Sequence, residues 1–197
     1  MTDWLTPMIA KIAFVAMAAG WYAMRIPHVR KSRRTGIAHD AMDSRERLRL
    51  AISLTGLGII PLVYIAIGEP AFGRRSFHSG VALAGIAVAI AALVMFRLTH
   101  KVLGRNWSVS LQMRQDHKLI THGVYARIRH PMYTAFWLWA IAQALLLPNW
   151  IAGLSGLIGF GTLYLLRVGP EEAMMERQFG QEYRDYMART GRLWPKV

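Results

Sequence analysis

The chain alternates between long apolar segments and shorter polar connections. We predict five apolar segments, over about 4–24, 48–67, 81–96, 131–147 and 151–168. An upright helix needs about 20 apolar residues to cross the hydrocarbon of a bilayer, so the shorter segments need interfacial flanks. Only the tripeptide PNW separates the last two segments, which predicts a tight antiparallel helical hairpin. The pattern predicts an all-α integral membrane protein with five transmembrane helices.

Basic residues are concentrated in alternate connections. Of the 24 Lys and Arg residues, eight lie in 25–49, seven in 97–130 and six in 167–197. The other side carries only Arg74 and Arg75, with Lys11 near the start of the first segment. Basic residues accumulate on the cytosolic side of membrane proteins. We therefore predict a multi-pass protein with its amino terminus outside and its carboxyl terminus in the cytosol.

Composition narrows the possible functions. Apolar residues make up 54% of the chain although its formal net charge is +13, so the charge is segregated from the apolar segments. The basic clusters lie beside predicted spans without a nucleic-acid motif, which indicates contact with anionic membrane lipids rather than nucleic acid. The absence of cysteine excludes disulfides, thiolate metal sites and cysteine nucleophiles, and we expect no metal. The first segment lacks the flanks of a cleaved signal peptide, so we expect it to remain as a membrane helix.

Two polar regions, 97–130 and 167–197, are both predicted on the cytosolic face, where they can meet. We predict that the second forms an amphipathic helix, with Pro170 near its start and acidic residues in its first turn. Its apolar stripe consists of Met174, Met175, Phe179, Tyr183 and Tyr186. The chain thus divides into three amino-terminal helices with a basic loop (1–96) and a core of polar loop, hairpin and cap helix (97–197).

The segment THGVYARIRHPMY, residues 121–133, is unusually polar for the edge of a membrane span. Gly123 permits a turn or a close backbone approach, and Pro131 suits the first turn of the fourth helix. Arg129 and His130 are thus predicted at the mouth of that helix. Two interpretations remain open: the arginines anchor the interface while His130 caps the helix, or these side chains form a binding site.

A second cluster, LYLLRVGPEEAMME, ends the fifth apolar segment. Arg167 could extend to the interface, and Glu171 and Glu172 could merely favour the amino end of a helix. Taken together, the two clusters predict a cationic, aromatic site with a carboxylate at the membrane surface. Such a site suits an amphiphilic substrate and a charged, soluble cofactor, because aromatic rings can face a sulfonium ion.

The series RNWS, HKLITHGVYARIRHPMY, RVGPEE and FGQEYRDYMARTGRLWP resembles the isoprenylcysteine carboxyl methyltransferase family, within the membrane methyltransferases that include phospholipid N-methyltransferases. The resemblance covers about residues 97–197. It implies S-adenosylmethionine as methyl donor, bound in a cytosolic pocket that the tail caps. It implies cofactor contacts from His117, Lys118, Leu119, Ile120, Tyr125, His130, Pro131, Met132, Tyr133 and Glu171.

The resemblance also implies that Arg167 is the arginine on the substrate side, which we take as the catalytic residue. The glutamate run of the family is shorter here, since Ala173 follows Glu172, and the role of Glu172 is open. A further polar cofactor contact is expected near 110–112. Methyl transfer from a sulfonium is an in-line displacement, so catalysis consists mainly of alignment and desolvation. A carboxylate or thiolate acceptor needs no base, whereas an amine does, and His130 and Glu172 are the candidates.

The predicted function is therefore methylation of a lipophilic small-molecule or lipidated acceptor, with an isoprenylcysteine carboxylate as first choice. Methylation of a phospholipid amine or of a small thiol is the alternative within this class. A membrane reductase that uses NADPH is a second class, but no dinucleotide-binding glycine motif is present. A membrane scaffold without enzymatic activity is a third. The acceptor and the oligomeric state stay open, since the small residues of GLSGLIGFG could pack within or between chains.

Overall fold

The structure, a computed structural model, describes residues 4–34, 43–68, 70–103 and 119–196. These residues form helices and no named strand, so the predicted all-α class is confirmed for the described part of the chain. In chain order the elements are α1 (Pro7–Arg34), α2 (Ser44–Leu54), the π-helix η2 (Thr55–Ile59), α3 (Ile60–Ala66), α4 (Ser79–Leu103), the 3-10 turn η4 (Gly123–Ala126), α5 (Pro131–Leu146), α6 (Trp150–Phe179) and α7 (Gln181–Arg189).

Four helical segments are long and apolar enough to cross a membrane. They are Pro7–Val29, Ser44–Ala66, Ser79–Leu103 and Trp150–Phe179, and the second combines α2, η2 and α3. The fourth predicted span corresponds to α5, whose 16 residues make it too short for the same criterion. At 1.5 Å per residue α5 is about 24 Å long.

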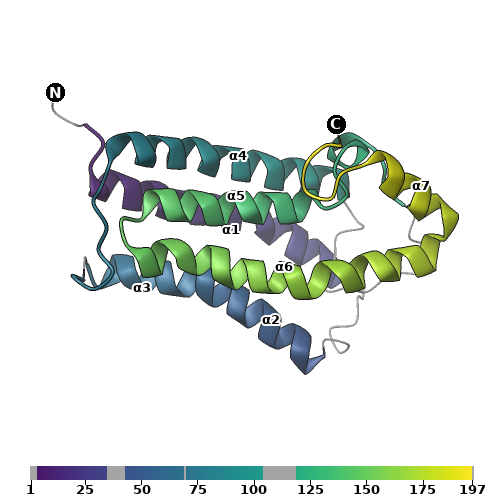
Figure 1. The fold of residues 1–197 in the computed structure, drawn as a ribbon, viewed down its shortest axis with the longest axis horizontal. Helices are drawn as coiled ribbons and strands as arrows, with labels where there is room; N and C mark the ends of the chain where they lie inside the picture. Colours follow the sequence, from purple (N-terminus) through teal and green to yellow (C-terminus); the bar gives the residue numbers. More distant parts are fainter. Residues whose placement is uncertain (1–3, 35–42, 69, 104–118, 197) are drawn as a thin grey trace.

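Helix α5 nevertheless runs from one end of the bundle to the other (Figure 1). Where it ends, the turn into α6 is hydrogen-bonded to the α3–α4 connection, with Trp150 N donating to Gly73 O at 2.7 Å. Asn149 caps α6 by accepting from Ile151 N and Ala152 N, both at 3.0 Å. The predicted antiparallel hairpin of α5 and α6 is confirmed. The start of α5, the end of α4 and helix α7 all lie at the opposite end (Figure 1).

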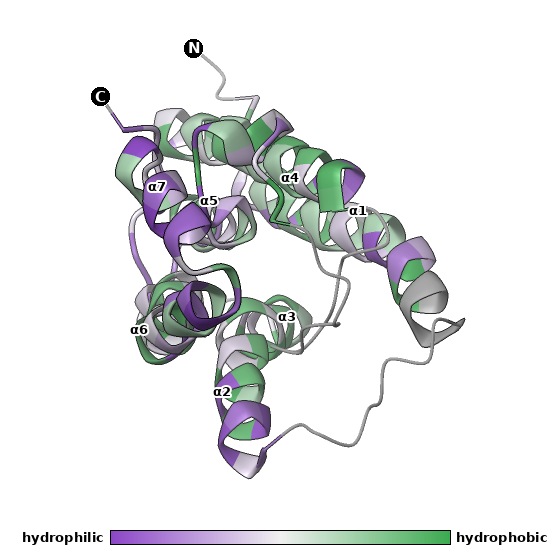
Figure 2. Cartoon of the chain, turned by 90° about the vertical axis from the view of Figure 1, so that its right-hand side faces the viewer, coloured by the Kyte–Doolittle hydropathy of each residue, from purple (hydrophilic) through white to green (hydrophobic). Residues whose placement is uncertain are grey.

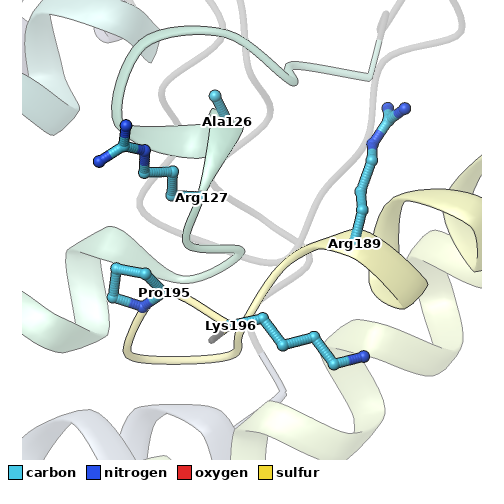
Figure 3. A pocket seen from close by; sticks show the side chains of 5 residues that line it. All are labelled: Ala126, Arg127, Arg189, Pro195 and Lys196. Atoms are coloured by element: carbon cyan, nitrogen blue, oxygen red, sulfur yellow. The ribbon is translucent and has the colours of Figure 1, made fainter.

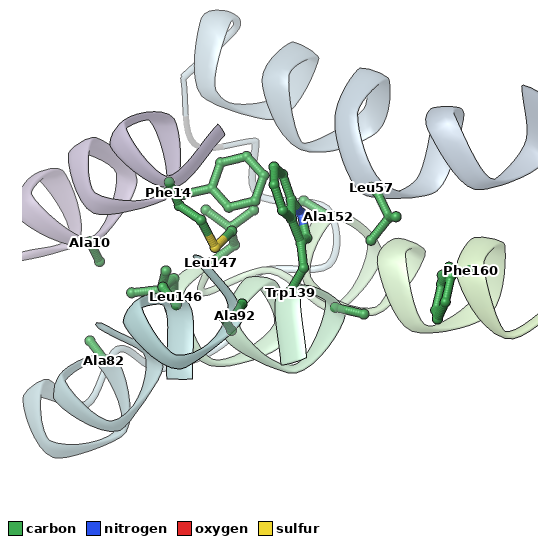
Figure 4. Close-up of a cluster of buried hydrophobic side chains, with 14 of the residues drawn as sticks. Ala10, Phe14, Leu57, Ala82, Ala92, Trp139, Leu146, Leu147, Ala152 and Phe160 are labelled. Carbon is green, nitrogen blue, oxygen red and sulfur yellow. The ribbon is translucent and has the colours of Figure 1, made fainter. Parts of the chain in front are cut away.

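The core is centred on α5, which packs between α4 and α6 and also touches α1. On one side, Phe14 of α1 meets Trp139 of α5 edge-on, with ring centroids 6.4 Å apart (Figure 4). On another, α4 presents small residues, and a Cβ added at Gly85 would stand 2.9 Å from Leu146 Cγ. Small residues allow close packing of helices in membranes, where apolar burial itself gives little driving force.

Glycines also bring η2, which continues α2, into backbone contact with α6. A Cβ at Gly56 would meet the carbonyl oxygen of Ser155 at 2.2 Å, so no larger residue fits without a shift of the backbone. The buried Gln143 of α5 ties this contact together, since its Nε2 lies 3.0 Å from both Gly56 O and Ser155 Oγ. The small residues of 153–161 that α5 and α2 contact therefore serve packing within the chain.

The outer surface of the bundle is apolar. Large exposed side chains include Met8, Ile12, Val15, Leu62, Ile90, Ile158 and Leu165, from α1, α3, α4 and α6. Seen from the end that carries α7, hydrophilic residues gather on α7 and at the start of α2 (Figure 2). This division is the one expected of a bundle whose flanks face lipid.

One predicted boundary is wrong. Pro170 was expected to open a separate tail helix, but α6 continues through it to Phe179, and the break comes at Gly180 with φ of +55°. Proline normally disfavours a helical conformation in the residue before it, because the proline ring clashes with the Cβ of that residue. Gly169 has no Cβ, so the helix tolerates Pro170 at the cost of one backbone hydrogen bond.

Candidate active site

The segment that precedes α5 is shaped by Gly123. Its φ is +62°, and a Cβ there would lie 2.7 Å from Val102 Cγ2 of α4, so both the conformation and the packing require glycine. The η4 turn follows, and the chain then extends to His130, whose φ and ψ are −122° and 60°. Gly123 therefore fixes where the next residues reach the mouth of α5, as predicted.

The carboxyl-terminal tail pairs with this segment along the backbone. Arg129 N donates to Gly191 O at 2.8 Å, His130 N donates to Arg192 O at 3.0 Å, and Gly191 N donates to Arg127 O at 3.1 Å. Helix α7 adds a further bond, from the Tyr186 hydroxyl to the Tyr125 carbonyl at 2.7 Å. The prediction that the two polar regions meet is confirmed for the described residues.

Glu172 is the centre of an ion cluster that holds these parts together. Its carboxylate is buried and lies 3.1 Å from Arg129 Nε, 3.1 Å from Arg192 Nε and 3.2 Å from His130 Nε2. The Arg129 guanidinium also donates to the backbone carbonyls of Met187 and Thr190 at the end of α7. Arg129 is therefore not merely an interface anchor. The role of Glu172, left open by the sequence, is structural: its ion pairs and hydrogen bonds join α6 to the mouth of α5 and to the tail.

Glu171 belongs to a second, more accessible group of side chains. The Tyr133 hydroxyl donates to its Oε2, the Oε1 atom lies 3.7 Å from His130 Nδ1, and Oε2 lies 3.9 Å from Arg167 Nε. The Glu171 side chain is 26% exposed, against 11% for Glu172. Glu171 is thus the carboxylate of the pair that a ligand can reach.

The two carboxylates decide the protonation of His130. Burial opposes the charged imidazole, but the hydrogen bonds and charges of Glu171 and Glu172 outweigh it, so the pKa of His130 is raised above its usual value. His130 makes no side-chain hydrogen bond as a cap of α5, which removes the capping interpretation. Burial, with the nearby charge of Glu171, also raises the pKa of Tyr125, which stays a neutral phenol.

Aromatic rings form one wall of the site. The rings of His130 and Tyr133 stack with centroids 5.3 Å apart, and Tyr164 of α6 meets Tyr133 edge-on at 5.5 Å. Phe160 lies behind Tyr133 at 6.1 Å. A cation that enters beside Glu171 would therefore meet the neutral rings of Tyr133 and Tyr164.

Arg167 lies at the side of the site that faces α2. Its Nη1 is 3.1 Å from Oε1 of Glu46, a residue in the first turn of α2. The predicted proximity of Arg167 and Glu171, one helical turn apart, is confirmed by their ion pair. Arg167 is thus shared between two carboxylates from different helices, which interface anchoring alone does not require.

The structure brings together four of the predicted site residues, which are His130, Tyr133, Arg167 and Glu171. Pro131 and Met132 form the first turn of α5 beside them, and Leu119 and Ile120 are half-buried ahead of η4. His117, Lys118 and the contact expected near 110–112 lie outside the described residues. The sequence interpretation missed Glu46, Tyr164 and Arg192 as neighbours of the site.

A small cavity adjoins this region. It has a volume of about 210 Å³ and is lined by Ala126, Arg127, Arg189, Pro195 and Lys196, from the η4 turn and the carboxyl-terminal segment (Figure 3). None of its lining residues is a predicted cofactor contact, and its volume is below the range of about 300–1,000 Å³ usual for ligand sites. The cavity is therefore distinct from the ion cluster.

Comparison with known proteins finds similarity to one family. The model of the isoprenylcysteine carboxyl methyltransferase (ICMT) family matches residues 83–177. A probable protein-S-isoprenylcysteine O-methyltransferase of Oryza sativa subsp. indica is 31% identical over 108 residues, which cover 54% of this chain and 56% of the relative. The protein-S-isoprenylcysteine O-methyltransferase of Homo sapiens is 34% identical over 85 residues, which cover 43% and 30%. The matched part thus spans about half of the rice protein and less of the human one.

The fold has a solved counterpart. The structure of the eukaryotic intramembrane Ras methyltransferase ICMT, solved without a monobody, aligns with 97% of this chain and 71% of its own chain, with a TM-score of 0.60 and 19% identity. The alignment also covers most of residues 1–82, which precede the stretch that the family model matches. The predicted resemblance is therefore confirmed: residues 83–177 carry the sequence pattern of the ICMT family, and the helical bundle has the fold of a solved ICMT.

Proposed function

We propose that this protein is a membrane methyltransferase that transfers a methyl group from S-adenosylmethionine to the carboxylate of an isoprenylated cysteine. The observation that carries the proposal is the group formed by His130, Tyr133, Arg167 and Glu171, all within the segment that matches the family. It combines a reachable carboxylate, an aromatic wall and a guanidinium at one end of an apolar bundle.

The residues present suit the proposed donor. The partly exposed carboxylate of Glu171 can accept hydrogen bonds from an amine or from ribose hydroxyls, and the rings of Tyr133 and Tyr164 can face a sulfonium ion. The donor would supply an activated methyl group. Leu119, Ile120 and Tyr125, in and before the η4 turn, are proposed as further donor contacts. Tyr186 of α7 donates a hydrogen bond to the carbonyl of Tyr125.

Arg167 suits the acceptor. The two residues before it, Leu165 and Leu166, are 74% and 48% exposed, so the helix meets lipid directly beside the guanidinium. An acceptor that moves in the bilayer can keep its isoprenoid in lipid while its carboxylate reaches Arg167. A guanidinium can bind a carboxylate through two parallel hydrogen bonds and so orient one oxygen toward the donor.

The state of the possible bases favours a carboxylate acceptor over an amine. Methylation of an amine first needs a base to remove a proton. Glu172 is held by Arg129 and Arg192, and His130 is held by both glutamates, which favour its protonated form. A carboxylate is already deprotonated and needs neither group.

We further propose that the chain crosses the membrane five times, with α5 as the short fourth span and its carboxyl terminus in the cytosol. The support is that α5 joins the two ends of the bundle and that the basic residues of the sequence cluster toward and beyond the carboxyl ends of α1, α4 and α6. Flanking interfacial residues such as Arg129 and Asn149 would complete the crossing by α5.

This topology can be tested with single cysteines, because the natural chain contains none. Ser76→Cys lies in the exposed α3–α4 connection, and Gln178→Cys lies on the exposed end of α6. A membrane-impermeant maleimide added to intact cells is expected to label the first and to reach the second only after the membrane is opened. Labelling of both in intact cells would overturn the five-span arrangement.

The activity can be tested with the full chain in lipid nanodiscs, tritium-labelled S-adenosylmethionine and a farnesylated cysteine. We expect label to enter the farnesylcysteine and to leave as volatile methanol after mild alkali, because methyl esters hydrolyse whereas N-methyl and S-methyl products do not. Label in an alkali-stable product would indicate an amine or thiol acceptor. No transfer to any acceptor by folded protein would contradict the proposal.

In the same assay, Glu171→Ala is expected to weaken donor binding by about 1–3 kcal/mol, the cost of losing a charge-assisted hydrogen bond. Glu176→Ala is the matched control, since Glu176 lies on the same helix and pairs with exposed Arg184. Equal donor affinity in the two variants would mean that Glu171 only supports the helix.

A further inference from the structure

Glu46 has an unusual place for a carboxylate. It lies in the predicted basic connection 25–49, yet it is 9% exposed and points at α6 rather than at the arginines beside it in sequence. Its Oε1 is 3.1 Å from Arg167 Nη1, while its distance to Arg49 is 3.9 Å. Through this pair, the start of α2 reaches the candidate active site.

The contact is close but incompletely bonded. Among the described residues, neither Oε1 of Glu46 nor Nε of Arg167 completes a hydrogen bond of good geometry, although both atoms are buried. A buried guanidinium needs a counter-charge, and Glu46 supplies one. Because the hydrogen-bonding capacity of the pair is only partly used, a better-oriented carboxylate can replace Glu46 at little cost.

The charges around Arg167 make that replacement necessary. Glu46 and Glu171 already place two carboxylates within 3.1 and 3.9 Å of one guanidinium. A third carboxylate, from an acceptor, would approach a guanidinium that already faces two carboxylates. Glu46 is the nearer of the two, and like charges at such distances repel. An anionic acceptor can bind Arg167 well only if Glu46 moves away.

We propose that Glu46 is a positioning residue that holds Arg167 in place in the empty site and competes with the acceptor carboxylate for it. Glu46 thereby sets the affinity for acceptors according to their charge. This inference rests on the proposed function, because it assigns the acceptor carboxylate to Arg167. Glu46 lies outside residues 83–177, so this control belongs to the half of the chain that the family model does not match.

The test is Glu46→Gln, which keeps the size of the side chain and removes its charge. The KM for a farnesylcysteine carboxylate is expected to fall about 5- to 10-fold, as for the loss of one neighbouring like charge near a surface. The inhibition constant of the matching farnesylcysteine carboxamide, which has no charge, is expected to stay the same, as is the donor affinity. Glu46→Asp keeps the negative charge, so its KM for the carboxylate is expected to match that of the wild type.

Glu176→Gln provides the matched control, because it removes one charge from an exposed ion pair of α6 and should leave the KM unchanged. An unchanged or raised KM in Glu46→Gln, with active wild-type protein, would overturn the inference. A fall in KM that Glu46→Asp shares would also overturn it, because charge would not be the cause. If wild-type protein methylates no carboxylate, the proposed function fails first, before Glu46 is changed, and the inference falls with it.

Discussion

Replacing Glu172 by alanine is expected to release the carboxyl-terminal segment from the bundle and to destabilise the fold by about 3–5 kcal/mol, the range for breaking a buried ion pair. Glu172 is the shared partner of Arg129, Arg192 and His130. Its removal leaves cationic groups from two parts of the chain, the segment before α5 and the carboxyl-terminal tail, without their common carboxylate. The measurement is thermal unfolding in detergent, together with limited proteolysis of the segment after Gly180.

Glu176→Ala is the control for this experiment. Its partner Arg184 is 49% exposed, and exposed ion pairs contribute about 0–1 kcal/mol. We expect its unfolding and its cleavage pattern to match those of the wild type. If Glu172→Ala unfolded at the wild-type temperature with an uncleaved tail, the ion cluster would not be what holds the tail in place.

Arg167→Lys is expected to bind S-adenosylmethionine normally and to lose turnover by about 100-fold, the effect of a small misplacement of reacting groups. Lysine keeps the positive charge that pairs with Glu46 and Glu171. It cannot bind a carboxylate through the two parallel hydrogen bonds of a planar guanidinium. Donor affinity and initial rates, measured on the same preparation, separate the two effects.

Arg177→Lys, on the exposed last turn of α6, is the matched substitution and should be nearly silent. The competing explanation for Arg167 is interface anchoring, in which lysine serves as well as arginine does. Near-normal turnover of Arg167→Lys with every acceptor tested would support that explanation and would remove the main reason for an anionic acceptor.

The bundle was largely predictable because apolar runs and basic connections are strong local signals. The five predicted segments correspond to α1, the α2–α3 unit, α4, α5 and α6, although most of the helices extend beyond the apolar residues. The helix ends at 44–47 and 171–179 contain no continuous apolar run, so the apolar segments predicted from hydropathy stopped short of them. The predicted start of a separate helix near Pro170 was wrong because Gly169, which precedes it, lacks the Cβ whose clash with proline normally ends a helix.

The site was predictable in part. His130, Tyr133, Arg167 and Glu171 stood in motifs of a known family, and the structure brings them together. Glu46 was not predictable, because it is a lone glutamate among arginines and its partner is 121 positions away in sequence. The role of Glu172 also depended on tertiary contacts, since nothing local distinguishes it from Glu171. The two glutamates differ in their tertiary partners: Glu172 meets Arg129 and Arg192, whereas Glu171 meets Tyr133 and Arg167.

The glycine contact between η2 and α6 is a point about which α2, the helix before η2, can pivot. Gly56 packs against the backbone of Ser155. Glu46 lies about ten residues before this pivot, which is roughly 15 Å along a helix. A rotation of α2 by roughly 10° about this pivot would carry Glu46 through roughly 2.6 Å, enough to break its contact with Arg167 while Gly56 hardly moves. The π-helical turn Thr55–Ile59, a form of backbone common at functional sites, lies at the same point. A small rotation at this contact, deep within the bundle, would thus be enough to separate Glu46 from Arg167.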